Sequence, residues 1–466
     1  MESTEKIQQR EKPLSLLHIT WPIFIEILLF MLMGSVDTLM LSRYSDQAVA
    51  AVGVASQVMG LVTLLFGFVT AGTSILVAQY LGAKDERKAK EVFTVSILAN
   101  FGIGIMISVL LYFFSPYILK LMGLDADLIV RGNSFLKIVG VFMFIQAIMM
   151  TISATLRSYG FTKDMMKVTI LMNILNAIGN YFVIFGPFGL PVLGESGVAW
   201  STSTARIICT VIIIFIFMKR IGFISFKKVI QSKPIEHIRN LFKIGIPAAG
   251  ENISYNASQI IITIFITMIG TEALTTKVYA QNIMMYIFLF SVAIGQGEQI
   301  IIGRLVGARE LRTAYDHCIR SLKLGILIST SMAILGALFA KPLLSIFTDN
   351  QHIIHTGSLL LMCTIILEPG RAFNLIVISS LRAAGDVKFP VMMGILSMWG
   401  VSIPIAYILG IHFELGLVGV WIGFIADEWI RGLLMLWRWR SRKWENASFV
   451  QNRSLNEESG SATISS

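Results

Sequence analysis

The chain has 466 residues, of which 55% are hydrophobic and only 14% are charged, and its formal net charge is +10. Because soluble domains carry about 25% charged residues, this composition excludes an ordinary soluble protein and indicates a chain that lies in lipid. The basic residues are spread over many short segments instead of forming one patch, so we expect membrane lipid and no nucleic acid among its partners.

Apolar runs long enough to cross a bilayer follow one another through the chain. A spanning helix needs about 20 apolar residues. Twelve runs suit this length, at 17–41, 48–79, 92–114, 133–156, 167–188, 196–218, 242–270, 278–303, 322–340, 354–381, 389–411 and 415–437. The first run carries Glu26 and Asp37 and has no small-residue cleavage site, so we interpret it as a transmembrane helix and not as a signal peptide.

Lysine and arginine fall mainly in alternate loops, those that follow the second, fourth, sixth, eighth, tenth and twelfth runs. Because basic loops stay on the cytoplasmic side, we expect a multi-pass protein of a bacterial-type inner (plasma) membrane with both termini in the cytoplasm. The predicted divisions are an N-lobe at 1–218, a cytoplasmic linker at 219–241, a C-lobe at 242–443 and a disordered cytoplasmic tail at 444–466.

The two halves share residues at a constant offset of 225 positions, since Pro22 and Glu26 correspond to Pro247 and Glu251. Further pairs are Gly82-Ala83 with Gly307-Ala308, and Leu156-Arg157, Gly160 and Lys163 with Leu381-Arg382, Gly385 and Lys388. Because each half has an even number of spans, both halves run in the same direction. The sequence therefore predicts an all-α integral membrane fold, in which two parallel-repeat six-helix lobes surround a central cavity.

Acidic residues inside the predicted spans need a partner, a proton or a cation, because an ionised carboxylate at the bilayer centre costs about 2.5–3.5 kcal/mol. Glu26 and Asp37 lie 11 residues apart on one face of the first span, roughly 16 Å along its axis. Pro22 and its counterpart Pro247 each free a backbone carbonyl and permit a bend. A bend that depends on carboxylate charge would couple protonation to the shape of the lobe.

Several motifs occur in order along these spans. They are Pro22…Gly34-Ser35-Val36-Asp37-Thr38, Gln79-Tyr80-Leu81-Gly82-Ala83, Leu156-Arg157-Ser158-Tyr159-Gly160, Asn173…Asn176…Asn180-Tyr181…Phe185-Gly186, Gly197-Val198-Ala199-Trp200-Ser201-Thr202 and Leu381-Arg382-Ala383-Ala384-Gly385-Asp386. The ordered set resembles the multidrug and toxic compound extrusion (MATE) family over nearly the whole chain. The resemblance implies export of amphipathic, often cationic, drugs in exchange for H⁺ or Na⁺, with no other cofactor.

The resemblance also implies a coupling role for Asp37, which matches the aspartate of the family's first helix. Asn176 and Asn180 lie four residues apart on one face of the fifth span. Some family members have an aspartate at the second position, where this chain has Asn180. Its amide can still offer an oxygen to Na⁺ or hydrogen-bond to a protonated Asp37. The candidate residues for ion or proton coupling are Asp37, Asn176, Asn180, Glu26 and Thr202.

The second half carries charged residues inside its spans that the first half lacks. Arg371 is placed to pair with an acid of the same half, and the family's C-lobe sodium site does not transfer residue by residue. The candidate C-lobe polar network is Glu251, Glu298, Glu368 and Arg371. Glu26 and Glu251 are symmetry mates, so a shared scaffold role is the alternative for both. We interpret Asp427, Glu428 and Arg431 as structural pairs along one helix.

The favoured function is a cation-coupled multidrug antiporter, acting as a monomer on small organic cations. A lipid-linked oligosaccharide flippase or a narrow metabolite exporter of the same superfamily is the alternative, although a flippase would need a basic cavity and the charges inside these spans are mainly acidic. We expect no enzyme, because no catalytic His/Asp pair, serine nucleophile motif or metal-ligand cluster occurs. An ion channel is disfavoured because nothing resembles a selectivity filter. Cys209, Cys318 and Cys363 lack metal-ligand spacing, so we expect neither a disulfide nor a metal site.

Overall fold

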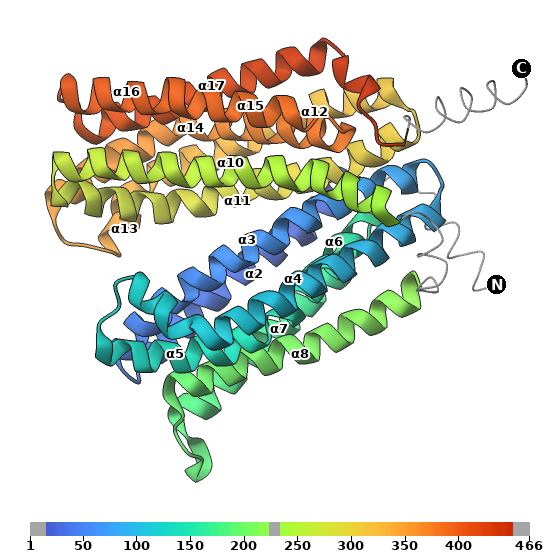
Figure 1. Ribbon diagram of the computed structural model, residues 1–466. Helices are drawn as coiled ribbons and strands as arrows, with labels where there is room; N and C mark the ends of the chain where they lie inside the picture. The colour runs from blue at the N-terminus through green and yellow to red at the C-terminus, as the bar shows by residue number, and fades with distance from the viewer. Residues whose placement is uncertain (1–14, 223–233, 451–466) are drawn as a thin grey trace, which may run out of the picture.

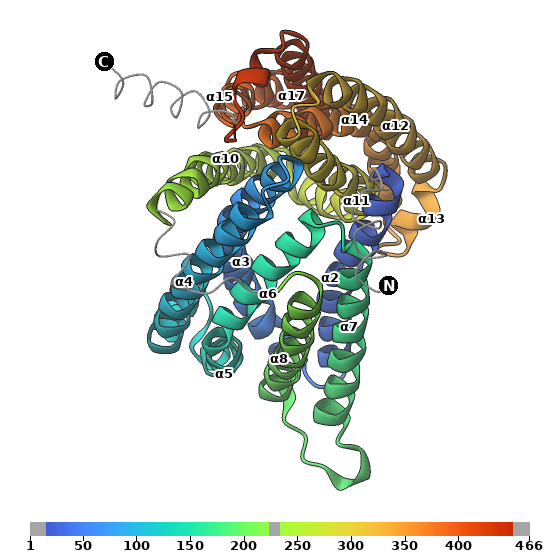
Figure 2. The same cartoon turned by 90° about the vertical axis from the view of Figure 1, so that its right-hand side faces the viewer.

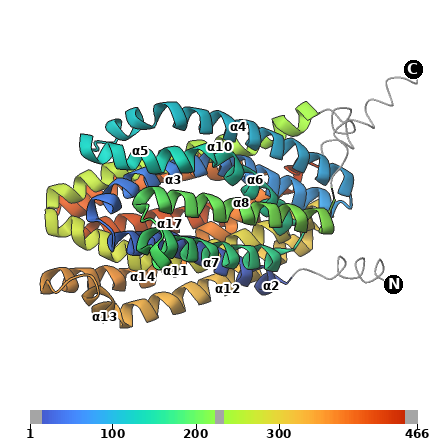
Figure 3. The ribbon, with the colours of Figure 1, turned by 90° about the horizontal axis from the view of Figure 1, so that it is seen from below.

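The computed structural model describes residues 15–222 and 234–450. Within these ranges the chain is almost entirely helical and contains no β-strand. Figure 1 shows two bundles of helices, one from each range, which converge at one end and separate toward the other. Seen from below, the long helices of both bundles run in roughly the same direction (Figure 3).

The first bundle is the N-lobe. Its elements are α2 (Leu16–Ser42), α3 (Asp46–Gly82), α4 (Glu86–Leu121), α5 (Ala126–Val141), α6 (Met143–Ser158), α7 (Thr162–Phe185), the short turn η1 (Pro187–Gly189) and α8 (Gly194–Arg220). Side chains in the turns fix two of the helix starts, because Ser45 accepts a hydrogen bond from the Ala48 amide and Asp85 accepts one from the Lys88 amide. Helices α5 and α6 meet at Phe142 with a bend of 48° and together form one span.

The second bundle is the C-lobe. Its elements are α10 (Pro234–Ile269), α11 (Thr271–Gly307), α12 (Leu311–Leu338), α13 (Ala340–Ser345), α14 (Gln351–Ala384), α15 (Lys388–Ser397), η2 (Met398–Ser402), α16 (Ile403–Tyr407), η3 (Ile408–His412), α17 (Gly416–Arg440) and η4 (Lys443–Asn446). The segments from α15 to η3 continue one another as a single span at 388–412, with π-helical turns in its interior. Both α2 and α10 begin at the end where the lobes converge, so the lobes run in parallel (Figure 1).

Ten described helices are long and apolar enough to cross a membrane, and the bent α5–α6 pair makes eleven. The remaining long helix is α17, which contains Asp427, Glu428 and Arg431. Together these elements match the twelve predicted apolar runs. The predicted fold class of twelve helices in two six-helix lobes is therefore confirmed.

The structure differs from the predicted linker and tail at their edges. Helix α10 begins at Pro234, so residues 234–241 of the predicted linker are helical, while residues 223–233 lie outside the described part. Trp444, the first residue of the predicted tail, is fully buried. Its ring stacks on Trp439 with 4.1 Å between centroids, and its Nε1 donates to the Trp439 carbonyl at 2.8 Å. The tail was predicted to be disordered because the residues after Trp444 are mostly polar, and this composition gave no sign that Trp444 packs against α17. Residues 451–466 lie outside the described part.

The two lobes come closest where α3 crosses α11, near the C-terminal ends of both helices. A Cβ atom at Gly82 would overlap the backbone carbonyl of Arg304, and a Cβ atom at Gly307 would overlap that of Gln79. The two glycines are 225 positions apart, as are Gln79 and Arg304. Each helix therefore meets the other through equivalent residues, and only glycine permits this approach.

Side chains of each lobe also hydrogen-bond to a helix end of the other lobe. Gln79 donates from Nε2 to the Ala383 carbonyl at 2.7 Å, and Arg304 donates from Nη2 and Nε to the Ser158 carbonyl at 2.7 and 3.1 Å. Ser158 ends α6 and Ala383 lies near the end of α14, where carbonyls have no partner within their own helix. We call the two glycines and these two donor–acceptor sets the inter-lobe contact.

We expect Gly82→Ala to destabilise the protein, because the added methyl group must push α3 away from the Arg304 backbone. Overpacking of this kind costs about 1–3 kcal/mol, and the midpoint of thermal unfolding in detergent measures it. Gly102→Ala on α4 is the matched control, since a Cβ there meets nothing within 4 Å and alanine favours a helix. Equal midpoints for the two variants would show that the crossing tolerates a side chain.

Candidate functional site

The predicted N-lobe residues meet in a chain of hydrogen bonds that joins α2, α7 and α8. Asn180 donates from Nδ2 to Asp37 Oδ1 at 2.5 Å and lies 3.5 Å from Asn176 Oδ1. Asn176 in turn donates from Nδ2 to Thr202 Oγ1 at 3.1 Å, and the Ser201 hydroxyl donates to the Asn176 carbonyl at 3.0 Å. The structure thus brings four of the predicted coupling residues together, and Ser201 joins them.

The amides of this site are held in the protein interior. Asn176 and Asn180 are 1% and 0% exposed, and Thr202 is 4% exposed, whereas Asp37 is half-buried. Buried polar atoms are usually hydrogen-bonded, yet Asn180 Oδ1 has no hydrogen-bond partner among the described residues. A carboxylate and an unpaired amide oxygen are the kinds of group that bind Na⁺ or share a proton.

Arg206 of α8 is a charged residue near Asp37 that the sequence analysis does not single out. It lies one helical turn after Thr202 and interacts electrostatically with Asp37. Its Nε is buried and has no hydrogen-bond partner within the described residues. Its positive charge is of the sign that would offset an ionised Asp37. The sequence contained a signal for this residue, because Arg206 falls inside the predicted span 196–218. A charged side chain inside a span is costly and therefore marks a candidate functional residue.

Glu26 does not join the Asp37 site, although both lie on α2. Its carboxylate is 3.8 Å from Arg157 of α6, whose Nη1 also donates to Gln296 of α11 at 3.1 Å. In the C-lobe, the symmetry mate Glu251 forms an ion pair with Arg382. Equivalent pairs in both lobes support the scaffold role, in which the fourth span of each lobe is tied to the first.

The two predicted bending positions lie inside continuous helices. Helix α2 runs through Pro22 and α10 runs through Pro247 without a break in helical structure. Each proline removes one hydrogen bond from its helix. A bend that responds to charge stays a prediction.

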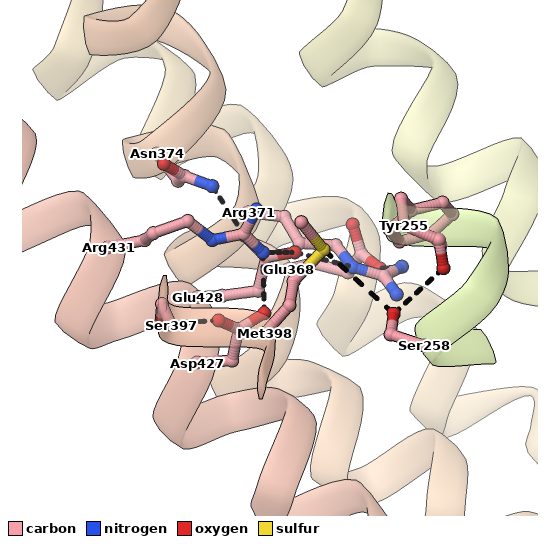
Figure 4. Close-up of polar contacts among 10 residues, drawn as sticks. All are labelled: Tyr255, Ser258, Glu368, Arg371, Asn374, Ser397, Met398, Asp427, Glu428 and Arg431. Atoms are coloured by element: carbon pink, nitrogen blue, oxygen red, sulfur yellow. Dashed lines mark hydrogen bonds and ion pairs between the residues drawn. The ribbon is translucent and has the colours of Figure 1, made fainter. Parts of the chain in front are cut away.

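The C-lobe contains a network of carboxylates and guanidiniums between α14 and α17 (Figure 4). Arg371 lies 2.9 Å from Glu368 of the same helix and 3.8 Å from Glu428 of α17. Arg431 lies 2.5 Å from Asp427 and 3.4 Å from Glu428. Three carboxylates thus share two guanidiniums, which leaves one excess negative charge when all five groups are ionised. We call these five residues the C-lobe network.

Neutral side chains hold the carboxylates of this network in place. Ser397 donates from Oγ to Asp427 Oδ1 at 2.5 Å, and Asn374 donates from Nδ2 to Glu428 Oε2 at 2.8 Å. Tyr255 of α10 lies on the opposite side of Arg371 from α17 (Figure 4). Salt bridges along α17 were expected, but the sequence could not show that the same residues also reach α14.

The predicted C-lobe set is only partly brought together. Glu368 and Arg371 belong to the C-lobe network, and Glu251 lies close to it, since a Cβ at Gly394 would be 3.4 Å from Glu251 and 3.9 Å from Arg431. Glu298 lies apart from the network. It is fully buried and pairs with His317 of α12 at 3.2 Å.

The three cysteines are free thiols, with Cys209 and Cys318 buried and Cys363 half-buried. Among residues 15–222 and 234–450, no group of three histidine, cysteine, aspartate or glutamate side chains is arranged to hold a metal ion.

A protein-family model described as MatE matches residues 22–182 and 247–408 of this chain. The two matched stretches correspond to the two lobes and cover more than half of the sequence. The chain belongs to the MATE family of transporters. It is therefore a multi-pass membrane protein.

Curated relatives match this MATE transporter along almost its whole length. The uncharacterized transporter YisQ of Bacillus subtilis strain 168 is 53% identical over 444 residues, which cover 95% of this chain and 97% of the relative. The probable multidrug resistance protein NorM of Thermotoga maritima is 26% identical, and the match covers 95% of each chain.

Solved MATE structures share its fold. One is the outward-facing conformation of a multidrug resistance MATE family transporter of the MOP superfamily, with a TM-score of 0.83, 19% identity and coverage of 92% of this chain and 95% of that one. Another is a MATE transporter in the bent conformation, with a TM-score of 0.84, 18% identity and coverage of 92% and 94%. At this identity the likeness establishes the two-lobed fold alone.

We expect Arg431→Gln to destabilise this MATE transporter by about 3–5 kcal/mol, because the buried Asp427 and the half-buried Glu428 would lose their shared guanidinium. Thermal unfolding in detergent measures the loss. Arg440→Gln changes the same kind of residue on the same helix, but Arg440 is exposed and makes no ion pair within the described residues, so we expect little effect. If both variants unfolded at the wild-type temperature, the C-lobe network would not be what joins α14 to α17.

Proposed function

We propose that this MATE transporter exports amphipathic organic cations in exchange for H⁺ or Na⁺, by alternating access of its two lobes. The proposal rests chiefly on one observation, the Asp37 carboxylate that is hydrogen-bonded to Asn180 within the N-lobe. Two further facts support it: the NorM relative is described as a probable multidrug resistance protein, and the C-lobe network has an excess of carboxylates over guanidiniums.

The coupling step follows from the charges around Asp37. In the ionised state the carboxylate accepts from Asn180 and is compensated by Arg206. A proton or a Na⁺ ion that binds there cancels the negative charge, which weakens the attraction to Arg206 and frees α2 to shift relative to α7 and α8. Because Glu26 is on the same helix, this shift reaches Arg157 of α6 and, through it, Gln296 of the C-lobe.

The inter-lobe contact and the charge of the loops support an orientation of the transporter in the membrane. The lobes converge at the end where α2 and α10 begin (Figure 1), and the loops at that end carry most of the basic residues. By the positive-inside rule we assign this end to the cytoplasm. On this assignment the cargo leaves to the outside, and the coupling ion enters from there, while the cytoplasmic end is closed.

The alternative is a narrow exporter of one metabolite. The relative at 53% identity is described only as an uncharacterized transporter, so its name does not favour multidrug export over this alternative. A flippase for a pyrophosphate-linked lipid is less compatible with the structure, because the ionised groups between α14 and α17 are more acidic than basic.

Transport of a fluorescent cationic dye into everted vesicles or out of proteoliposomes tests the proposal, with a pH gradient and a Na⁺ gradient imposed separately. We expect one gradient to drive the dye and Asp37→Asn to abolish that transport without loss of expression. Asp164→Asn is the control, because that carboxylate lies at the start of α7, 3.2 Å from Arg220 and away from the site. Wild-type transport by Asp37→Asn would refute the coupling role, and no dye movement under either gradient would favour the narrow exporter.

We further expect Arg206→Gln to tighten binding of the coupling ion, because a permanent positive charge near Asp37 is lost. Coupling between interacting sites is worth about 1–3 kcal/mol, so the half-saturating Na⁺ concentration falls by about tenfold, or the proton concentration in a proton-driven transporter falls by the same factor. Arg206→Lys keeps the charge and should behave as wild type. Unchanged ion dependence in Arg206→Gln would show that Arg206 does not act on Asp37 during transport.

A further inference from the structure

A cavity of about 680 Å³ lies at the convergent end of the C-lobe. Its walls are the start of α10, the turn Gly385–Lys388 between α14 and α15, and residues Ala447 and Phe449, which follow η4. Figure 2 looks at this end of the molecule and shows α10 beside α3 and α4, with α15 near its other side. The cavity is separate from both the Asp37 site and the C-lobe network.

Three basic side chains line the cavity without an acidic partner. Arg239 and Lys243 lie one turn apart on α10, and Lys388 begins α15. None of the three forms an ion pair within the residues that the structure describes. Asp386 also lines the cavity, but Arg438 holds its carboxylate at 2.6 Å.

Because Asp386 is already paired with Arg438, Glu236 is the one other carboxylate of the lining that can offset the charge of the three basic side chains. Helix α15 adds to the positive potential, since it starts at Lys388 with no side-chain cap and points its free amides toward the same turn. The cavity is thus suited to an anionic group that carries more than one acceptor oxygen.

The repeat shows that these charges are not part of the shared scaffold. In the sequence, the positions 225 residues before Arg239 and Lys243 are Leu14 and His18. Only Lys388 has a basic counterpart, Lys163. The residues that join the lobes recur at equivalent places in both halves, whereas this basic cluster is confined to the C-lobe and needs a separate explanation.

Exposed apolar side chains lie next to the basic residues on α10. Phe242, directly before Lys243, is 46% exposed, and Ile246, three residues after it, is 63% exposed. This surface presents cations beside an apolar strip at one end of a span, which is the arrangement that contacts both the headgroup and the acyl chain of a phospholipid. A lipid source for the anion is therefore favoured over a soluble one.

We propose that this cavity binds the phosphate group of an anionic phospholipid through Arg239, Lys243 and Lys388. The bound headgroup lies next to the inter-lobe contact, because the segment at 447–450 that walls the cavity also reaches Gln79. The Phe449 amide and the Ser448 hydroxyl donate to Gln79 Oε1 at 3.1 and 3.3 Å. An anionic lipid thus stabilises the state in which this end is closed.

A glycine in the cavity wall allows the segment at 447–450 to pack closely against that wall. Gly385 has φ of 103°, and a Cβ there would overlap the Ala447 carbonyl. Headgroup, segment and Gln79 therefore form one continuous contact from the lipid to the α3–α11 crossing.

The test is lipid binding by the full-length protein in detergent, measured as retained lipid by native mass spectrometry and as the shift in thermal unfolding. The probes are dioleoylphosphatidylglycerol, dioleoylphosphatidylcholine and glycerol 3-phosphate. We expect wild-type protein to retain phosphatidylglycerol in preference to phosphatidylcholine. A basic side chain near anionic lipid contributes roughly fivefold in affinity, so the triple variant Arg239→Gln, Lys243→Gln, Lys388→Gln should lose at least tenfold.

Lys163→Gln is the matched control, because it removes the symmetry-related exposed lysine at the start of α7 and should leave phosphatidylglycerol binding unchanged. If the triple variant does not fold, Lys388→Gln alone should still lose roughly fivefold against Lys163→Gln. Equal binding of the two lipids by wild type, or undiminished phosphatidylglycerol binding by the variants, would overturn the proposal. Displacement of phosphatidylglycerol by glycerol 3-phosphate at equal concentration would support the phosphate site and identify its source as soluble.

Discussion

The crossing of α3 and α11 is the constraint on which the arrangement of the two lobes depends. In lipid there is little hydrophobic gain from bringing two helices together, so helix contacts rely on small residues and on hydrogen bonds. Gly82 and Gly307 let the two backbones touch, and Gln79 and Arg304 supply donors to carbonyls that end α6 and α14. The crossing therefore satisfies backbone groups that have no partner in their own lobe, and opening this end requires water or other donors to replace them.

The residues that we propose for ion coupling are connected to this crossing through side chains that belong to both lobes. Asp37 and Glu26 lie on α2, and Arg157 bridges Glu26 to Gln296 of α11. Arg157 is followed directly by Ser158, whose carbonyl accepts from Arg304. A short path of ion pairs and hydrogen bonds therefore joins α2 to the inter-lobe contact, and the C-lobe network lies outside that path.

Much of this organisation could be predicted from the sequence, because it depends on hydropathy and on repeated residues. The twelve spans follow from apolar run length, and the offset between Pro22 and Pro247 revealed the parallel lobes. Asp37, Asn176 and Asn180 were predicted to meet because two of them share a helix face, and they do meet. Other features depend on which helices lie side by side, and span length carries no such information. The link from α17 to Arg371 and the separation of Glu298 from Glu368 are of this kind.

Two misses have different causes. Arg206 lies inside a predicted span, as Arg371 and Arg431 do, but no motif or acidic neighbour along the chain distinguishes it, and only the packing of α8 against α2 brings it near Asp37. The burial of Trp444 was hidden, because one anchoring residue at the start of a polar segment does not alter its composition. Composition describes a segment as a whole, whereas docking can depend on a single side chain and the cavity that receives it.

The reciprocal form of the inter-lobe contact has a consequence for the history of the chain. Gly82 meets Arg304 while the equivalent Gly307 meets Gln79, and each donor has its acceptor at the equivalent place in the other half. A surface that pairs with its own copy in this way is the isologous interface of a two-fold homodimer. A single six-helix ancestor with this surface could have assembled with itself before its gene was duplicated and joined. The present-day protein can thus be regarded as a tethered dimer, in which a change at either glycine must fit a surface encoded in the other half.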